Sequence, residues 1–238
     1  MSGIFNLDAP IWVFMGEVAD LIILALLWWC CCLGIVTVGA STTALYYVIG
    51  KKIRREQTYV AKDFFKSFKE NFRQSVPLSI VVIIAFISLT LYISFIIGGL
   101  YLGETDGYLK YMIPLTILFA FEVLNFHTYS WALLSRFEMS TRGLVRTAFI
   151  MIHKHLLTTV WNLVVMAAMV LCIIKFPLAL VVAPSGIVWG QSFMLQSVFT
   201  KYIEAAHEAT MGQEEIETVE EIASTGEEEI DLEYKKEQ

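Results

Sequence analysis

Five long apolar runs divide this chain, at residues 21–39, 77–100, 111–134, 156–174 and 178–199. An α-helix rises about 1.5 Å per residue, so about 20 residues cross the hydrocarbon core of a bilayer, which is ~30 Å thick. Each run is close to that length. The pattern therefore predicts an all-α membrane protein with about five transmembrane helices.

Lysine and arginine are concentrated in alternate loops between these runs. Residues 1–20 contain neither, and the loops after the second and fourth runs contain only Lys110 and Lys175. The other two loops contain the remaining basic residues of the first 200: Lys51, Lys52, Arg54, Arg55, Lys62, Lys66, Lys69, Arg73, Arg136, Arg142, Arg146 and Lys154. Cytoplasmic loops carry an excess of lysine and arginine. We therefore predict an N-terminus outside the membrane, five crossings and a C-terminus in the cytoplasm.

An amphipathic helix is predicted over residues 5–20, before the first run. Its apolar face has residues at spacings of 4, 3 and 4: Leu7, Ile11, Phe14 and Val18. Asp8 is a potential N-cap, and Pro10 falls in the first turn, where a missing N–H has no cost. We expect this helix to lie on the outer surface of the membrane.

Residues 34–43 are the least regular part of the apolar region, because glycine is mixed there with valine, threonine and serine. We predict a break between Gly34 and Gly39, followed by a second helix over residues 43–55 that Ser41 or Thr42 caps. One long tilted helix is the alternative, because hydroxyl side chains can bond back to their own helix.

Residues 63–76 predict a basic helix with an aromatic stripe. Its basic side chains are interleaved with phenylalanines at spacings of 1, 3 and 4: Phe64, Phe65, Phe68 and Phe72. Such a helix suits the cytoplasmic surface of a membrane. These four phenylalanines form the candidate interaction surface, which lipid headgroups, a partner protein or the protein's own helices would cover.

The last two runs are joined only by residues 175–177, which predicts an antiparallel hairpin, and Pro184 predicts a kink in its second helix. Beyond the hairpin the composition changes. Residues 204–238 contain 13 of the 23 acidic residues and only two of the 17 basic ones. We therefore divide the chain into a helical membrane domain, 1–203, and an acidic, disordered cytoplasmic tail, 204–238.

Ionisable residues inside a membrane span are costly, so they are candidates for function. The third run has three polar residues near its middle: Glu122, Asn125 and His127. At about 100° per residue, Glu122, Asn125 and Tyr129 share one face, whereas His127 and Trp131 lie on another. The polar face either lines a translocation path or a proton-sensitive site, or makes hydrogen bonds to another helix.

Signatures of enzymes are absent from the sequence. HExxH, GxSxG and Walker A motifs do not occur, and the consecutive cysteines at 30–32 point about 100° apart on a helix, so they cannot share a metal ion. His153 is predicted to lie on the solvated basic surface. We expect no catalytic, cofactor or metal site, and the topology explains the basic loops without a nucleic-acid partner.

Several segments carry a family resemblance: NLDAP at 6–10, ADLI at 19–22, LWWCCCL at 27–33, IVTVGASTTALYY at 35–47 and DFFKSFKENF at 63–72. In these segments the chain resembles the YesL family of bacterial multi-pass membrane proteins, whose domain has no known function. The family usually has Leu-Pro where this chain has Leu33-Gly34, and the acidic tail is not part of its pattern. The resemblance implies a location in the bacterial cell membrane and a helper role in carbohydrate uptake. It carries over no catalytic or binding residues.

Two functions remain open. The first is a non-catalytic accessory subunit that contacts the permease of a carbohydrate ABC transporter through its spans and its basic helix. The second is a small transporter or channel that uses the polar residues of the third run. The first two and the last two runs show no similarity to each other, so there is no sign of the inverted repeats common in transporters. This favours the accessory role.

Overall fold

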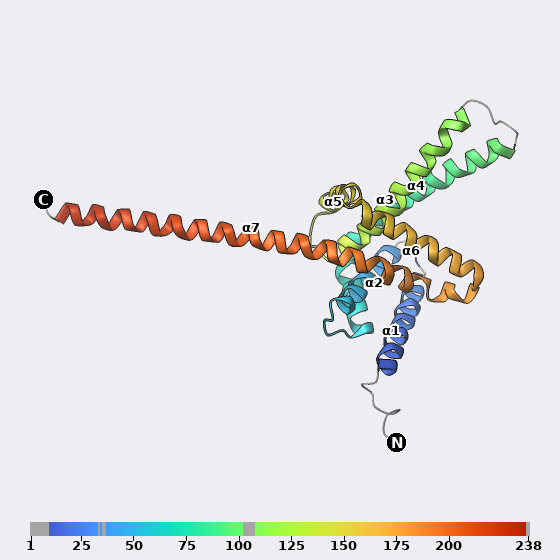
Figure 1. The fold of residues 1–238 in the computed structure, drawn as a ribbon, viewed down its shortest axis with the longest axis horizontal. Helices are drawn as coiled ribbons and strands as arrows, with labels where there is room; N and C mark the ends of the chain where they lie inside the picture. The colour runs from blue at the N-terminus through green and yellow to red at the C-terminus, as the bar shows by residue number, and fades with distance from the viewer. Residues whose placement is uncertain (1–9, 33, 35–36, 102–107, 237–238) are drawn as a thin grey trace, which may run out of the picture. The chain divides into compact units, whose positions relative to one another are not determined.

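The computed structural model describes residues 10–32, 34, 37–101 and 108–236, and every regular element in these ranges is a helix (Figure 1). The elements are α1 (Pro10–Cys31), α2 (Thr37–Ile53), α3 (Val60–Tyr101), α4 (Tyr108–Leu134), α5 (Thr141–Lys154), α6 (Leu156–Lys175), the 3₁₀ helix η1 (Pro177–Val181) and α7 (Ala183–Lys236). Four segments are long and apolar enough to cross a membrane: Phe14–Cys31, Val60–Tyr101, Tyr111–Leu134 and Leu156–Lys175. The predicted fold class is confirmed, with a number of candidate spans close to the five expected.

The chain divides into two compact units, residues 1–195 and 196–238. The second unit contains the C-terminal part of α7, which is helical as far as Lys236. The sequence predicted a boundary at residue 203 and a disordered tail after it. In the structure this stretch belongs to α7, and the predicted boundary and disordered tail stay predictions. The contacts described below all lie within the first unit.

Helices α1 and α2 form an antiparallel hairpin. Lys52, near the end of α2, places its Nζ 2.9 Å from Glu17 and also pairs with Asp20, both in the first half of α1. At the other end of the hairpin, Trp28 Nε1 donates a hydrogen bond to Thr42 Oγ1 at 3.1 Å. The basic end of α2 therefore lies beside the beginning of α1.

The predicted break is present, but it lies earlier in the chain than expected. α1 ends at Cys31 and α2 begins at Thr37, whose N–H and hydroxyl both donate to the Gly34 carbonyl, at 3.0 and 2.6 Å. Ser41 and Thr42 do not cap α2. They lie inside it and donate to the carbonyls four residues back, which is how hydroxyl side chains are accommodated within a helix.

The hairpin contradicts the predicted surface helix and bears on the predicted topology of the N-terminal region. α1 is continuous from Pro10 to Cys31, so residues 10–20 are not a separate surface helix, and residues 5–9, including Asp8, lie outside the described residues. Moreover, the beginning of α1 and Lys52 lie at the same end of the hairpin, whereas the predicted topology separates them by one crossing. The sequence suggested one crossing because α2 is rich in small and hydroxyl residues, which mark helix–helix contact more than contact with lipid.

Helix α2 lies at the centre of the first unit. Residues 39–46 and 48–50 are all buried, and α2 contacts α1, α3 and α4. Gly39 makes the closest approach: a Cβ added there would meet Ser79 Oγ on α3 first and would lie 2.5 Å from Cη2 of Trp131 on α4. Small residues on α2 therefore allow the neighbouring helices to pack closely against it.

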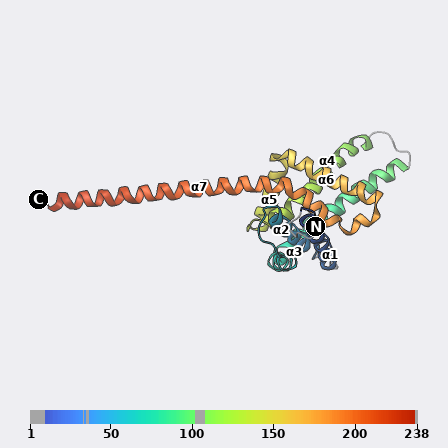
Figure 2. The same cartoon turned by 60° about the horizontal axis from the view of Figure 1, so that its bottom comes forward.

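Helix α3 is a single helix of 42 residues with Pro77 inside it. The predicted basic helix and the predicted second span are thus two parts of one element. α3 and α4 run side by side as a second antiparallel hairpin, with ring contacts between Tyr92 and Phe119 and between Phe86 and His127. Figure 2 shows this pair from a second direction. Residues 102–107, which join them, lie outside the described residues.

The predicted α6–α7 hairpin is confirmed. Trp161 Nε1 donates to the Gly190 carbonyl at 2.9 Å, and a Cβ on Gly186 would lie 2.6 Å from Met169 Cε. The fifth apolar run is divided between η1 and α7. Pro184 falls in the first turn of α7, where proline fits without a kink, so the predicted kink is absent there.

Helix α5, which the sequence analysis did not predict, connects α4 to α6. Ser140 caps it by accepting a hydrogen bond from the Gly143 N–H at 3.2 Å. One face is buried, through Leu144, Ala148, Met151 and Ile152. α5 is therefore an amphipathic helix that connects the candidate span in α4 to the candidate span in α6.

Candidate functional site

One buried glutamine joins four helices of the first unit. Oε1 of Gln191 on α7 accepts a hydrogen bond from the Tyr46 hydroxyl on α2 at 2.5 Å. Nε2 of Gln191 lies 3.4 Å from Thr128 Oγ1 on α4 and 3.4 Å from the backbone carbonyl oxygen of Asn162 on α6. Gln191, Tyr46, Thr128 and Asn162 are all buried. Both ends of the amide are satisfied, so the network ties the helices together at a fixed point.

A cavity of about 300 Å³ lies beside this network. Four aromatic side chains line it, Trp28, Trp29, Tyr46 and His127, with Thr42, Thr128 and Gln191 as its polar groups and aliphatic side chains elsewhere. None of the lining residues has a formally charged side chain at neutral pH. The cavity therefore suits a neutral, mainly apolar molecule with one or two hydrogen-bonding groups, since burying an unpaired charge is costly.

His127, one of the three candidates from the third run, lines this cavity. Its Nδ1 accepts a hydrogen bond from Nε1 of Trp131 at 3.1 Å, which in the neutral imidazole assigns the proton to Nε2. The predicted sharing of a face by His127 and Trp131 is therefore confirmed. Phe86 contacts the imidazole edge-on, with ring centroids 5.6 Å apart.

Glu122 and Asn125, the other two candidates, do not line the cavity. Oε1 of Glu122 lies 3.2 Å from Nε2 of His153 on α5, and the side chain of His153 is 64% exposed, in agreement with its predicted place on the surface. Asn125 is fully buried and donates to the Phe121 carbonyl of its own helix at 2.9 Å. Glu122 thus connects α4 to α5, and the three candidates do not form one site.

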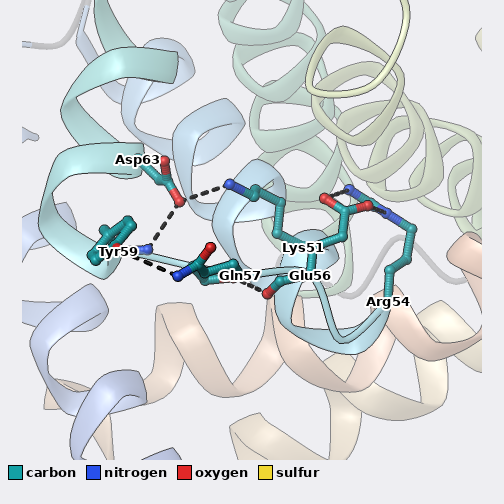
Figure 3. Close-up of polar contacts among 7 residues, drawn as sticks. Lys51, Arg54, Glu56, Gln57, Tyr59 and Asp63 are labelled. Carbon is teal, nitrogen blue, oxygen red and sulfur yellow. Dashed lines mark hydrogen bonds and ion pairs between the residues drawn. The ribbon is translucent and has the colours of Figure 1, made fainter.

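The turn between α2 and α3 is fixed by a set of ion pairs (Figure 3). Nζ of Lys51 lies 2.9 Å from Oδ2 of Asp63, which also accepts the Tyr59 N–H at 3.1 Å. Nε of Arg54 lies 2.6 Å from Oε1 of Glu56. The hydrogen bond to Asp63 raises the pKa of Lys51, and the hydrogen bond from Arg54 lowers the pKa of Glu56. These contacts hold the beginning of α3 against the end of α2.

Helix α2 ends in a Schellman motif. The Glu56 N–H donates to the Lys51 carbonyl and the Arg55 N–H donates to the Lys52 carbonyl, both at 3.0 Å. Arg55 has a φ of 58°, in the left-handed region where glycine is usual. The turn therefore contains a strained arginine whose side chain is exposed.

The four phenylalanines of α3 do not share one environment. Phe64 is fully buried and Phe68 is half-buried, whereas Phe65 and Phe72 are 44% and 38% exposed. Phe64 therefore belongs to the protein's own core. Phe65 and Phe72 remain on the surface, in the basic part of α3 that precedes the apolar run beginning at Pro77.

Together, the apolar helices and the buried amide network define a helical integral membrane protein. Residues 21–95, from α1 to the apolar part of α3, match a family model described as "Protein of unknown function, DUF624". No curated protein and no solved structure matches the chain.

The hydrogen-bond network around Gln191 was not predicted from the sequence. The available signal was the amide side chain of Gln191 inside the last apolar run, because a polar group there needs a partner; Asn162 takes part only through its backbone carbonyl.

Proposed function

We propose that this protein is a non-catalytic, multi-pass protein of the bacterial cell membrane that acts as an accessory subunit of a carbohydrate ABC transporter. Two considerations support this. The chain resembles the YesL family, and the match over residues 21–95 covers much of the segments that carry the resemblance. The observation that carries the proposal is the exposure of Phe65 and Phe72 at the basic beginning of α3.

Two exposed aromatic side chains among basic residues suit contact with another membrane protein. Aromatic residues are enriched at protein interfaces, and burying one phenylalanine contributes about 1.5–3 kcal/mol. Loss of both rings would then weaken association by about 3 kcal/mol or more, which is roughly a hundredfold. The intramolecular contacts of Phe64 explain that residue without a partner, but they leave Phe65 and Phe72 uncovered.

The proposed orientation places both basic loops in the cytoplasm. The positive-inside bias supports this for the α2–α3 turn and for residues 135–155. Because Lys52 pairs with Glu17, the beginning of α1 belongs on the same side. We therefore place the N-terminus in the cytoplasm together with the C-terminus, in place of the outside location expected from the sequence.

Affinity purification from native membranes tests the accessory role. The wild-type protein should co-purify with permease subunits of a sugar transporter, and a Phe65→Ala, Phe72→Ala double variant should lose most of them while accumulating normally. Phe176→Ala is the matched control. Phe176 is also an exposed phenylalanine, at 70%, but it follows the last residue of α6 and is not part of the basic beginning of α3. The absence of permease subunits from the wild-type sample would contradict the proposal.

A small transporter or channel is the second candidate, and the cavity beside Gln191 favours it. Glu122 and Asn125 do not support it, because they lie away from that cavity. Carbohydrate uptake by cells carrying Gln191→Met distinguishes the two functions. Loss of uptake with normal protein abundance and intact permease binding would favour the transporter, whereas unchanged uptake would favour the accessory subunit.

A further inference from the structure

A polar cleft of about 860 Å³ lies between the end of α2, the beginning of α3 and the α4–α5 turn. Four of its lining side chains are charged: Lys66, Glu70, Arg136 and Glu138. The cleft is held together at one side by Nε2 of Gln74 on α3, which donates to the Met139 carbonyl at 2.5 Å. It is separate from the cavity beside Gln191, with which it shares no lining residue.

The four charged side chains lack ion-pair partners among the residues that the structure describes. Arg136 is the unusual one, because its side chain is half-buried. Burial lowers the pKa of Arg136, and the nearby charge of Arg54 lowers it further, although Glu56 and Tyr47 act in the opposite direction. A partly desolvated guanidinium beside a second arginine favours binding of an anion.

The cleft lies where two membrane-spanning segments end. Leu134, one of its lining residues, is the last residue of the span in α4, and Ser135 to Ser140 follow it directly. On α3, Gln74 lies three residues before Pro77, where the apolar run begins. Residues at this depth meet the headgroups of the bilayer. The position of the cleft therefore favours a lipid over a soluble ion.

We propose that this cleft binds the headgroup of a phospholipid that carries both a phosphate and a primary amine, with the phosphate at Arg136 and Lys66 and the amine at Glu70 and Glu138. A guanidinium matches phosphate oxygens in a bidentate arrangement, and an ammonium group donates to carboxylates. An anionic headgroup without an amine leaves both carboxylates facing negative charge. A choline headgroup has no N–H to donate.

Thermal stability of the purified full-length protein in detergent measures the binding, because a ligand of the folded state raises Tm. Phosphatidylethanolamine should raise Tm more than phosphatidylcholine, phosphatidylglycerol or inorganic phosphate at equal concentration. Arg136→Gln and Lys66→Gln should each weaken the apparent affinity by about tenfold or more, through loss of charge-assisted hydrogen bonds. Arg142→Gln and Lys69→Gln are the matched controls, since both residues are exposed and neither lines the cleft.

A Glu70→Gln, Glu138→Gln double variant tests the amine separately. It should bind phosphatidylglycerol at least as well as phosphatidylethanolamine, because the two repelling carboxylates are gone. Equal effects of phosphatidylcholine and phosphatidylethanolamine on the wild type would overturn the proposal. The proposal would also be overturned if phosphatidylethanolamine raised the Tm of Lys66→Gln as much as that of the wild type, because this exposed substitution leaves folding intact. A rise in Tm with inorganic phosphate alone that equals the rise with phosphatidylethanolamine would overturn it as well. None of these outcomes depends on binding to a permease.

Discussion

Replacing Gly39 by alanine should destabilise the protein, although the same change elsewhere in a helix is usually favourable. Gly39 is buried in α2, and an added Cβ would lie 2.5 and 2.8 Å from two ring carbons of Trp131. Trp131 is 1% exposed, and its indole N–H is bonded to His127 at 3.1 Å. The ring therefore cannot move aside without losing that bond or shifting α4 against α2.

The expected magnitude follows from two opposing effects. Alanine is favoured over glycine inside a helix by about 0.5–1 kcal/mol. Overpacking a close-packed site costs about 1–3 kcal/mol. The steric effect is larger here because Ser79 Oγ and a fixed indole ring both obstruct the added Cβ, so we expect a net loss of about 1–2 kcal/mol in the free energy of unfolding.

Thermal unfolding of purified variants, followed by tryptophan fluorescence, measures this loss. Gly98→Ala is the matched control, because Gly98 lies inside α3 and an added Cβ there meets no atom within 4 Å. Gly98→Ala should leave Tm unchanged or raise it. A Gly39→Ala variant that melts at or above the temperature of Gly98→Ala would refute the close approach of α2 to Trp131.

Three further changes have definite expected results. Arg55→Gly should raise Tm, by an amount equivalent to about 1 kcal/mol, because glycine adopts a φ of 58° without strain; a lower Tm would mean that the arginine side chain makes a contact of its own. Glu122→Leu should change stability by less than about 1 kcal/mol, because the pair with the 64% exposed side chain of His153 leaves the buried Oε2 of Glu122 without a hydrogen bond, so the buried carboxylate is poorly compensated; a larger loss in chemical unfolding would contradict this weak pair. The pKa of Lys51 is raised in the folded state, so the stability from its bond to Asp63 is fully present below pH 10.5 and is lost as pH rises through the higher folded pKa. The Tm of the wild type should therefore fall above pH 10.5 more steeply than the Tm of Asp63→Asn. Parallel curves of Tm against pH would count against the bond.

The apolar runs were sufficient to predict most of the helices in the membrane region. α4 and α6 follow the runs at 111–134 and 156–174 closely, because a helix that faces lipid needs a continuous apolar surface. α2 was harder to interpret. Its residues 37–44 are mostly small or hydroxyl-bearing, as suits a helix that other helices cover. The hydropathy of the sequence therefore did not indicate that the chain turns back there through a hairpin.

The candidate site was less accessible to sequence reasoning than the fold. Spacing along α4 correctly separated His127 from Glu122, because residues on one helix have known angular positions. The partners of these residues depend on tertiary packing. Tyr46 and Gln191 are 145 positions apart in the chain, and nothing local in the sequence indicates that they meet.

The central claim is that the beginning of α1, the α2–α3 turn and the α4–α5 turn share the cytoplasmic side of the membrane. Labelling of single cysteines in intact cells tests it most directly, in a variant whose four native cysteines have been replaced. Ile11→Cys, Glu56→Cys and Glu138→Cys should react with an impermeant thiol reagent only after lysis, whereas Tyr101→Cys, at the far end of α3 and 90% exposed, should react in intact cells. Reaction of Ile11→Cys in intact cells, with Glu56→Cys protected, would contradict the α1–α2 hairpin and the shared cytoplasmic face.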